Sequence, residues 1–254
     1  MTLQGTTAQP QRVLALDTST ERLSLAVGPA GGPAWAEHEG VGGAQASAEL
    51  IPQVLQLLRQ CGLRVTDLDA IAFGCGPGAF TGLRTACAVV QGLAVAGRPG
   101  GIPVVPVPTL LAVADEACHT HPLPPGATLL ATLDARMDEL YVAVCTVQAH
   151  GRPRLNGPAW LSAPEALSTP DDGSLALLAS NALGTYAARL PSAWAQRPQV
   201  AAWPRATAVL RLVPDLWAQG QITDAAGAQP LYVRDKVALT TAEREALRAS
   251  PAQP

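Results

Sequence analysis

A glycine-rich turn is the chemically most distinctive feature of the sequence. Gly74, Gly76 and Gly78 follow an apolar run and precede a run typical of a helix. Free N–H groups at a helix start, with the positive end of the helix dipole, favour phosphate or carboxylate, and glycines let such a ligand approach the backbone closely. The pattern predicts an anion site that uses Gly76 and Gly78. A tight strand-to-helix turn with nothing bound would have the same sequence.

A second polar group follows the first apolar run of the chain, at Asp17, Thr18 and Ser19. A carboxylate and hydroxyl groups at a strand end are suited to hold phosphate and Mg²⁺. The alternative is a turn in which Asp17 and Ser19 bind neighbouring backbone N–H groups. Together the two segments predict a phosphate site. Whether a nucleotide binds there, in a cleft between two lobes, stays open.

Two better-known nucleotide motifs do not match. Gly74, Gly76 and Ala79 satisfy the glycine spacing of a dinucleotide fingerprint, but residues 94–108 lack the acidic residue that should follow. No Lys follows these glycines, as a P-loop requires. Both classes are therefore disfavoured.

The sequence also lacks the residue patterns of a catalytic metal site and of an enzymatic nucleophile. The sequence contains no HExxH, no GxSxG and no Cys/His arrangement of a nucleophile. The helix expected over residues 46–60 has no His. The four histidines, which we expect in loops, are His38, His119, His121 and His150. We therefore predict no metal site and no catalytic residue in this chain.

Composition narrows the class of protein. The chain has 254 residues, of which 48% are hydrophobic, 17 are basic and 20 are acidic, for a net charge of −3. This suits one large or two small folded domains. The absence of a positive field and the small number of aromatic residues argue against independent nucleic-acid binding. Five cysteines without paired spacing indicate a reducing cytoplasm, and neither a signal pattern nor a membrane span is evident.

The elements that must position these residues include two similar hairpins. Strands are predicted at 13–17 and 23–27, and again at 129–133 and 140–147. With Asp134 placed on Asp17, the two hairpins align without a gap. Repetition of a strand ending in Asp, a polar turn and a return strand suggests duplicated lobes. We assign the lobes to residues 12–107 and 108–222 and a C-terminal extension to residues 223–254.

The remaining pattern is α/β. Further strands are predicted at 70–73, 102–107 and 175–179, and helices at 47–60, 81–96, 110–117, 183–190, 206–218 and 241–249. Thr109 is the expected cap of the third helix.

The helix over 47–60 carries more apolar residues than one core contact needs. At about 100° per residue its two apolar stripes cover roughly 160°, against about 100° for one buried face. One stripe is Leu50, Val54, Leu57 and Cys61, and the other is Ile51, Leu55 and Leu58. The extra width predicts an intermolecular contact, although a helix sunk deeply into its own lobe would show the same pattern.

The helix over 81–96 would complete this contact. Its many Gly and Ala residues allow a second helix to approach closely, and Arg84 and Gln91 could form the polar rim. The predicted partner-binding residues are Leu50, Val54, Leu57, Cys61, Arg84, Ala88 and Gln91.

Four segments of the sequence resemble motifs of a known protein family. They are LALDTST at 14–20, GPGAFTGLR at 76–84, LDARMDELY at 133–141 and PLYVR at 230–234. In this order they resemble the bacterial TsaB (YeaZ) family. The two lobes and glycine turn also resemble the actin, Hsp70 and sugar-kinase superfamily, so the implied fold is two ribonuclease H-like lobes.

The resemblance implies a role without catalysis. Such a subunit supports a related protein, TsaD, in making N6-threonylcarbamoyladenosine in tRNA, with the ATPase TsaE joining the pair. It implies that the two first-lobe helices bind TsaD or a second copy as a homodimer, in the cytoplasm. The alternative from the residues is an ATP-dependent kinase or ATPase that uses Asp17 and the glycine turn. The sequence leaves open whether nucleotide binds, which dimer forms and what residues 241–254 do.

Overall fold

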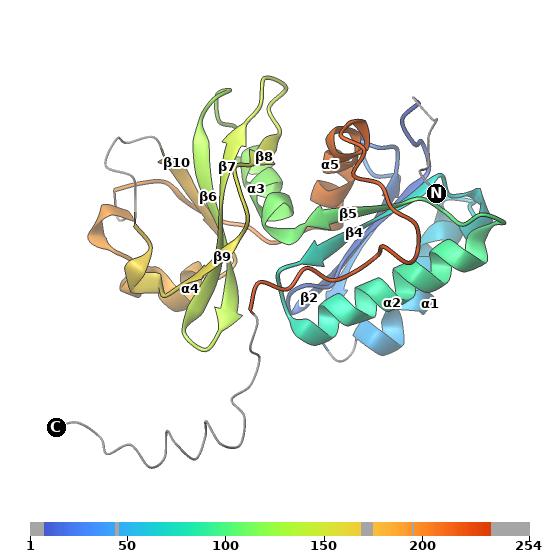
Figure 1. Cartoon of the computed structure of the whole chain (residues 1–254), viewed down its shortest axis with the longest axis horizontal. Coiled ribbons are helices and arrows are strands. Elements are labelled where there is room, and N and C mark those ends of the chain that lie inside the picture. Colours follow the sequence, from blue (N-terminus) through green and yellow to red (C-terminus); the bar gives the residue numbers. More distant parts are fainter. Residues whose placement is uncertain (1–7, 44–45, 169–174, 195, 235–254) are drawn as a thin grey trace, which may run out of the picture.

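The computed structural model describes residues 8–43, 46–168, 175–194 and 196–234. They form two sheets, each flanked by helices, which lie side by side (Figure 1). The order of the first sheet is β3-β2-β1-β4-β5, and that of the second is β11-β10-β6-β7-β8, with β9 added to β7. The predicted two-lobed α/β architecture is therefore confirmed.

The first sheet is mixed, because β2 runs antiparallel to β1 and β3 whereas β4 runs parallel to β1 and β5. Its strands are β1 (Val13–Asp17), β2 (Arg22–Gly28), β3 (Ala36–Val41), β4 (Ala70–Gly76) and β5 (Val104–Pro108). Alternate residues of β1 point to opposite faces: Leu14 and Leu16 join one core cluster, and Val13 and Ala15 join another. Both faces of this sheet are therefore buried.

Different helices cover the two faces. The core cluster with Leu14 and Leu16 contains residues of α1 (Ala46–Gln60) and α2 (Phe80–Gly97). The cluster with Val13 and Ala15 contains residues of α5 (Ala206–Ala218), which contacts β1, β2, β4 and β5. Figure 1 shows α5 on the opposite side of the sheet from α1 and α2. By length and hydropathy alone α2 could cross a membrane, but here it packs on β4 and α1.

The second sheet is built around the long hairpin of β6 and β7. Its strands are β6 (Thr128–Arg136), β7 (Glu139–Val147), β8 (Pro153–Leu155), β9 (Trp160–Ser162), β10 (Leu175–Ser180) and β11 (Gln199–Ala201). The helix α3 (Thr109–Thr120) packs on β6, β7 and β8, and α4 (Leu183–Tyr186) is a single turn. Short 3₁₀ helices lie at Val65–Asp67, Pro164–Ala166, Ala187–Arg189 and Ser192–Trp194.

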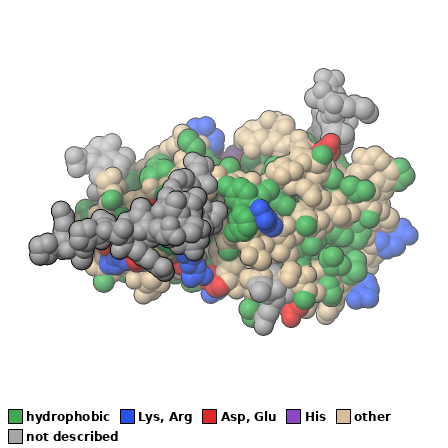
Figure 2. Space-filling view, turned by 60° about the horizontal axis from the view of Figure 1, so that its bottom comes forward, with side chains coloured by type: hydrophobic (Ala, Val, Ile, Leu, Met, Phe, Trp, Pro, Cys, Tyr) green, Lys and Arg blue, Asp and Glu red, His purple; other side chains and the backbone are tan. Residues whose placement is uncertain are grey.

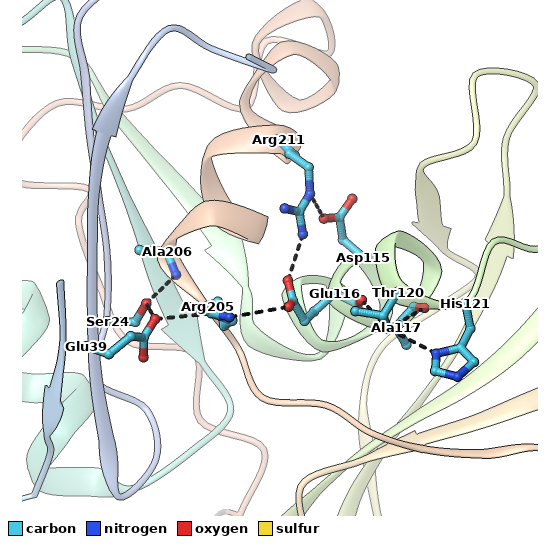
Figure 3. Close-up of polar contacts among 10 residues, drawn as sticks. All are labelled: Ser24, Glu39, Asp115, Glu116, Ala117, Thr120, His121, Arg205, Ala206 and Arg211. Carbon is cyan, nitrogen blue, oxygen red and sulfur yellow. Dashed lines mark hydrogen bonds and ion pairs between the residues drawn. The ribbon is translucent and has the colours of Figure 1, made fainter. Parts of the chain in front are cut away.

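Ion pairs join the lobes through α3 and α5 (Figure 3). Arg211 on α5 binds Asp115 (Nε–Oδ2, 2.6 Å) and Glu116 (Nη2–Oε2, 2.8 Å) on α3. Arg205, just before α5, lies 3.2 Å from Glu39 of β3 and 3.9 Å from Glu116. Asp115 is buried, and burial raises the pKa of its carboxyl. The positive charge of Arg211 opposes this upward shift. These contacts fix the two helices where the chain passes between the lobes.

The structure corrects the predicted lobe division at α5. We assigned residues 206–218 to the second lobe, but α5 packs on the first sheet, and Ser24 Oγ of β2 accepts the Ala206 N–H at 2.7 Å. Residues 223–234 also return to the first lobe, where Thr223 pairs with Val104 and Ala228 is buried in its core. The assignment was wrong because it followed sequence continuity, whereas the first lobe is completed by α5 and by the segment with Thr223 and Ala228.

Several local predictions also need correction. The first α3 residue is Thr109, preceded by Pro108 as N-cap, so Thr109 is not the cap. The strand β3 was missed, and it contains His38, while His119 lies in α3 rather than a loop. The region predicted as a helix over 183–190 is one α-helical turn followed by a 3₁₀ turn. The helix predicted over 241–249 lies outside the described residues.

The two hairpins match in outline but not in register. Under the gapless alignment Tyr141 is equivalent to Ser24. Ser24 pairs with Asp17, whereas Tyr141 pairs with Leu133, because a bulge follows Asp134. The return strand of the second hairpin is therefore displaced by one residue.

Candidate functional site: the interlobe cleft and the outer helices

A cleft of about 460 Å³ lies between the two hairpin turns. The first hairpin and the glycine turn form one wall, and the tip of β6–β7 with Asn181 forms the other. A C-terminal strap, residues 230–234, supplies Leu231, Tyr232, Val233 and Arg234 to the same cleft. The sequence analysis identified both hairpins and the glycine turn as candidate site segments, but it assigned no role in a cleft to the strap.

The glycine turn packs directly on the first hairpin. Ala79 N–H donates to Ser19 O at 2.7 Å, and Thr18 Oγ1 donates to Gly82 O at 2.8 Å. A Cβ atom on Gly78 would overlap Ser19 O, and one on Gly82 would overlap Thr18 O. These glycines are therefore needed so that the hairpin turn can press against the start of α2.

Asp17 lies behind this contact rather than in the cleft wall. Its side chain is buried, and Oδ1 accepts hydrogen bonds from Ser19 N at 2.9 Å and Ser19 Oγ at 2.6 Å. Oδ2 is buried against Gly74 and has no hydrogen-bond partner in the described structure. Burial raises the pKa of Asp17 to about 7, although the bonds from Ser19 oppose the shift.

The predicted phosphate residues do come together, but their groups are engaged inside the fold. Gly76 N–H donates to Thr109 Oγ1 at 3.0 Å, and the carbonyls of Thr18 and Ser19 face the start of α2. Of the predicted set, only Ser19 and Gly78 line the cleft. The N–H groups of Ser19, Gly76 and Ala79 already have acceptors within the fold, so these three donors are not available to a phosphate.

The predicted partner-binding stripe of α1 is wrong for three of its residues. Leu50 and Val54 are 0% exposed and Leu57 is 3% exposed, in the core of their own lobe. Cys61 is half-buried at the edge of that core. The sequence showed two apolar stripes but could not tell which one faced the sheet.

The second stripe is the outer one for two of its three residues. Ile51 is 46% exposed and Leu55 is 40% exposed, whereas Leu58 is buried. On α2, Ala88 is exposed, as predicted for a small interface residue, and Val95 is 69% exposed. Figure 2 turns this side toward the reader and shows hydrophobic side chains spread over the half that carries α1 and α2.

The two rim residues of α2 contact the C-terminal part of the chain. Gln91 Nε2 donates to Ala228 O at 3.0 Å, so this amide is already bound. Arg84 Nε donates to the Tyr232 hydroxyl at 3.2 Å, and its guanidinium lies 3.8 Å from the Phe80 ring centroid. The C-terminal strap therefore forms part of the α2 surface, which no pattern in the helix itself could show.

Groups of cysteines, histidines and carboxylates give no metal site among the described residues, since no three of them cluster suitably. All five cysteines are free, and four are buried. Burial raises the pKa of the thiols, to about 12 for Cys75 and Cys118 and still further for Cys145.

Comparison with known proteins gives consistent results. A family model described as TsaD, tRNA N6-adenosine threonylcarbamoyltransferase, matches residues 40–247. The tRNA threonylcarbamoyladenosine biosynthesis protein TsaB of Haemophilus influenzae is 28% identical over 89% of this chain and 94% of its own length. The protein of the same name from Escherichia coli K12 is 36% identical over 52% of this chain and 54% of its own.

A solved structure extends this similarity to the whole fold. YeaZ from Pseudomonas aeruginosa is 38% identical, covers 87% of this chain over 99% of its own, and superposes with a TM-score of 0.74. The two mixed sheets and the TsaD-type match place the fold in the predicted actin-like α/β class with two ribonuclease H-like lobes. Since similarity at this level spans nearly all of both chains, the protein belongs to the TsaB/YeaZ family.

Proposed function

We propose that this chain acts in tRNA threonylcarbamoyladenosine biosynthesis, as a non-catalytic subunit that binds and stabilises a TsaD-type catalytic subunit in the cytoplasm. The observation that carries the proposal is the outward apolar surface of α1 and α2. Ile51, Leu55 and Val95 are exposed there although the same helices already bury a full core face. Covering such residues with a second protein removes apolar area from water.

The small residues of α2 make this surface suitable for another helix. Ala88, Gly92 and Ala96 are exposed on α2, and a Cβ on Gly92 would meet no atom within 4 Å. A partner helix can therefore approach the α2 backbone closely. The functional effect would follow from mass action, because a subunit that binds only the active form of its partner raises the population of that form.

The same surface would serve the other expected associations. A homodimer through α1 and α2 would compete with TsaD binding, and a TsaE-type ATPase would join the assembled pair. The competing hypothesis, an ATP-dependent kinase or ATPase, receives no support from the geometry, since Asp17 is buried and Ala79 N–H is bound to Ser19 O.

The test is binding of the purified chain to TsaD from the same organism. Ile51→Glu with Leu55→Glu should weaken the affinity about 30-fold or more, because docking would bury carboxylates without partners at a cost of ~2 kcal/mol or more. The matched control is Trp160→Glu, which replaces an exposed hydrophobic residue on β9 of the other lobe. Unchanged affinity of the folded double variant would exclude this surface.

A further inference from the structure

The C-terminal strap is attached to the first lobe by its middle residues. Leu231 N–H donates to Cys75 O of β4 at 2.7 Å. The Tyr232 ring stacks on Phe80 at the start of α2, with 5.4 Å between ring centroids, and its hydroxyl accepts the bond from Arg84. These contacts place the strap along one lip of the cleft (Figure 1).

The last described residue of the strap is attached to the second lobe. Arg234 Nη2 lies 2.6 Å from Glu139 Oε2 and donates to Ala135 O at 3.1 Å. Its Nη1 contacts Met137 Sδ at 3.2 Å, and the side chain is only 14% exposed. We call the part of the β6–β7 tip that receives Arg234, residues 135–139, the seat. A bound guanidinium with several acceptors in one place is a specific attachment rather than a chance surface contact.

The backbone of the seat is held in an uncommon conformation. Arg136, Met137 and Asp138 have φ values of 61°, 55° and 59°, a left-handed region that residues other than glycine seldom occupy. Met137 and Asp138 are the two loop residues between the paired Arg136 and Glu139, and a two-residue hairpin loop takes positive φ at both positions. Arg234 binds the carbonyl side of this turn, and Arg189 binds Asp138 at 2.6 Å. The seat is therefore a turn set by the hairpin itself, to which Arg234 attaches.

The permanent connection between the lobes lies elsewhere. The chain passes between them at β5–α3 and again at β11–α5, where Arg211 binds the buried Asp115. In Figure 1, α3 and α5 lie toward the top of the region where the two lobes meet, and the strap lies toward the bottom. The strap therefore closes the side of the molecule opposite the natural pivot.

We propose that the strap is a releasable clasp that holds the two lobes closed over the cleft, with Arg234 in the seat as its catch. The cleft that it closes is apolar at its lips. Half of the exposed large hydrophobic side chains among the described residues surround it: Val41, Phe80, Met137, Leu231 and Tyr232. Release of Arg234 lets the lobes rotate about α3 and α5, which widens access to this apolar cleft.

Hydrogen exchange of the full chain, followed by mass spectrometry, tests the clasp. The peptides that decide are those with Thr20 and Asn181, which line opposite walls of the cleft and belong to neither the strap nor the seat. In Arg234→Gln their amides should exchange about tenfold faster, equivalent to ~1.4 kcal/mol of lost closure. Arg234→Lys keeps the charge but loses the planar fork, so it should give an intermediate rate. The control is Arg154→Gln, which removes an exposed arginine of β8.

Each result decides the matter. Faster exchange at both cleft walls, with the cores of the two sheets still protected, supports a clasp. Faster exchange confined to residues 135–139 and the strap means that Arg234 only orders the tip to which it binds, and the proposal fails. An equal rise at all amides, or no change at all, also overturns it.

Discussion

Ionisation of Asp17 should make the fold less stable as the pH rises. The carboxyl has an ordinary pKa of 3.8, and burial raises the pKa to about 7 in the folded protein. Between these values the folded state keeps a proton that the unfolded state has lost, so the free energy of unfolding falls with increasing pH. Above pH 7 the carboxylate is charged in both states, and the effect is complete. The full difference of about 3 pKa units corresponds to about 4 kcal/mol.

Asp17→Asn isolates this contribution. The amide oxygen can still accept the bonds from Ser19 N–H and Ser19 Oγ, but the side chain cannot ionise. The stability of the variant relative to the native chain should therefore rise with pH, by up to about 1.4 kcal/mol per pH unit between pH 4 and pH 7, and then stay constant. Urea unfolding followed by Trp fluorescence at several pH values measures it.

The matched control is Glu37→Gln, which removes an exposed carboxylate from the same sheet. Its stability relative to the native chain should change little over the same pH range. If the Asp17→Asn and native curves run parallel from pH 4 to pH 8, Asp17 does not titrate in this range and the argument from its buried, unpartnered Oδ2 is refuted.

Three further predictions test the packing of the first lobe and its cleft. Leu50→Ala should lower the free energy of unfolding by about 2–5 kcal/mol because it leaves a cavity in the core. Ile51→Ala removes an exposed side chain and should lower the free energy of unfolding by less than about 1 kcal/mol. Equal urea midpoints for the two variants would contradict the finding that Leu50 is buried and Ile51 exposed. Gly82→Ala should destabilise the fold because the new methyl group would meet Thr18 O. Gly92→Ala places its methyl group in open space on the same helix and should stabilise the fold by about 0.5–1 kcal/mol. Thermal unfolding of the two variants measures both effects. Calorimetric titration with ATP and Mg²⁺ should give no binding, and a saturable heat would show that the engaged donors of the glycine turn can be released.

The sequence predicted the parts of the fold that repeat a pattern. A continuous apolar run identified the strand at 13–17, and alternation identified the strand at 140–147. The bounds of α1, α2 and α5 were predicted to within one residue, and those of α3 to within three. The edge strand β3 was missed because two of its three exposed residues, Glu37 and Glu39, are charged, so the strand lacks an apolar run.

The parts that failed depend on contacts between distant segments. Helical periodicity shows that α1 has two apolar stripes, but only the sheet beneath decides that Leu50 faces inward and Ile51 outward. The glycines of the turn indicated a closely approaching group, and in the structure the Ser19 carbonyl of the same chain makes that approach at Gly78. Arg234 stood out only as part of the PLYVR segment, and nothing in that segment indicated its acceptors, which lie about a hundred residues earlier.

Because α5 covers one face of the first sheet, the order of synthesis matters. In a nascent chain, β1 to β5 emerge from the ribosome long before residues 206–218 are made. Until then the apolar face of the sheet that includes Val13, Ala15 and Ala72 is not covered by α5. The β6–β11 sheet, in contrast, is contiguous and can collapse as soon as it emerges. The later-made sheet should therefore mature first, and the earlier-made sheet only after residues 206–218 have emerged.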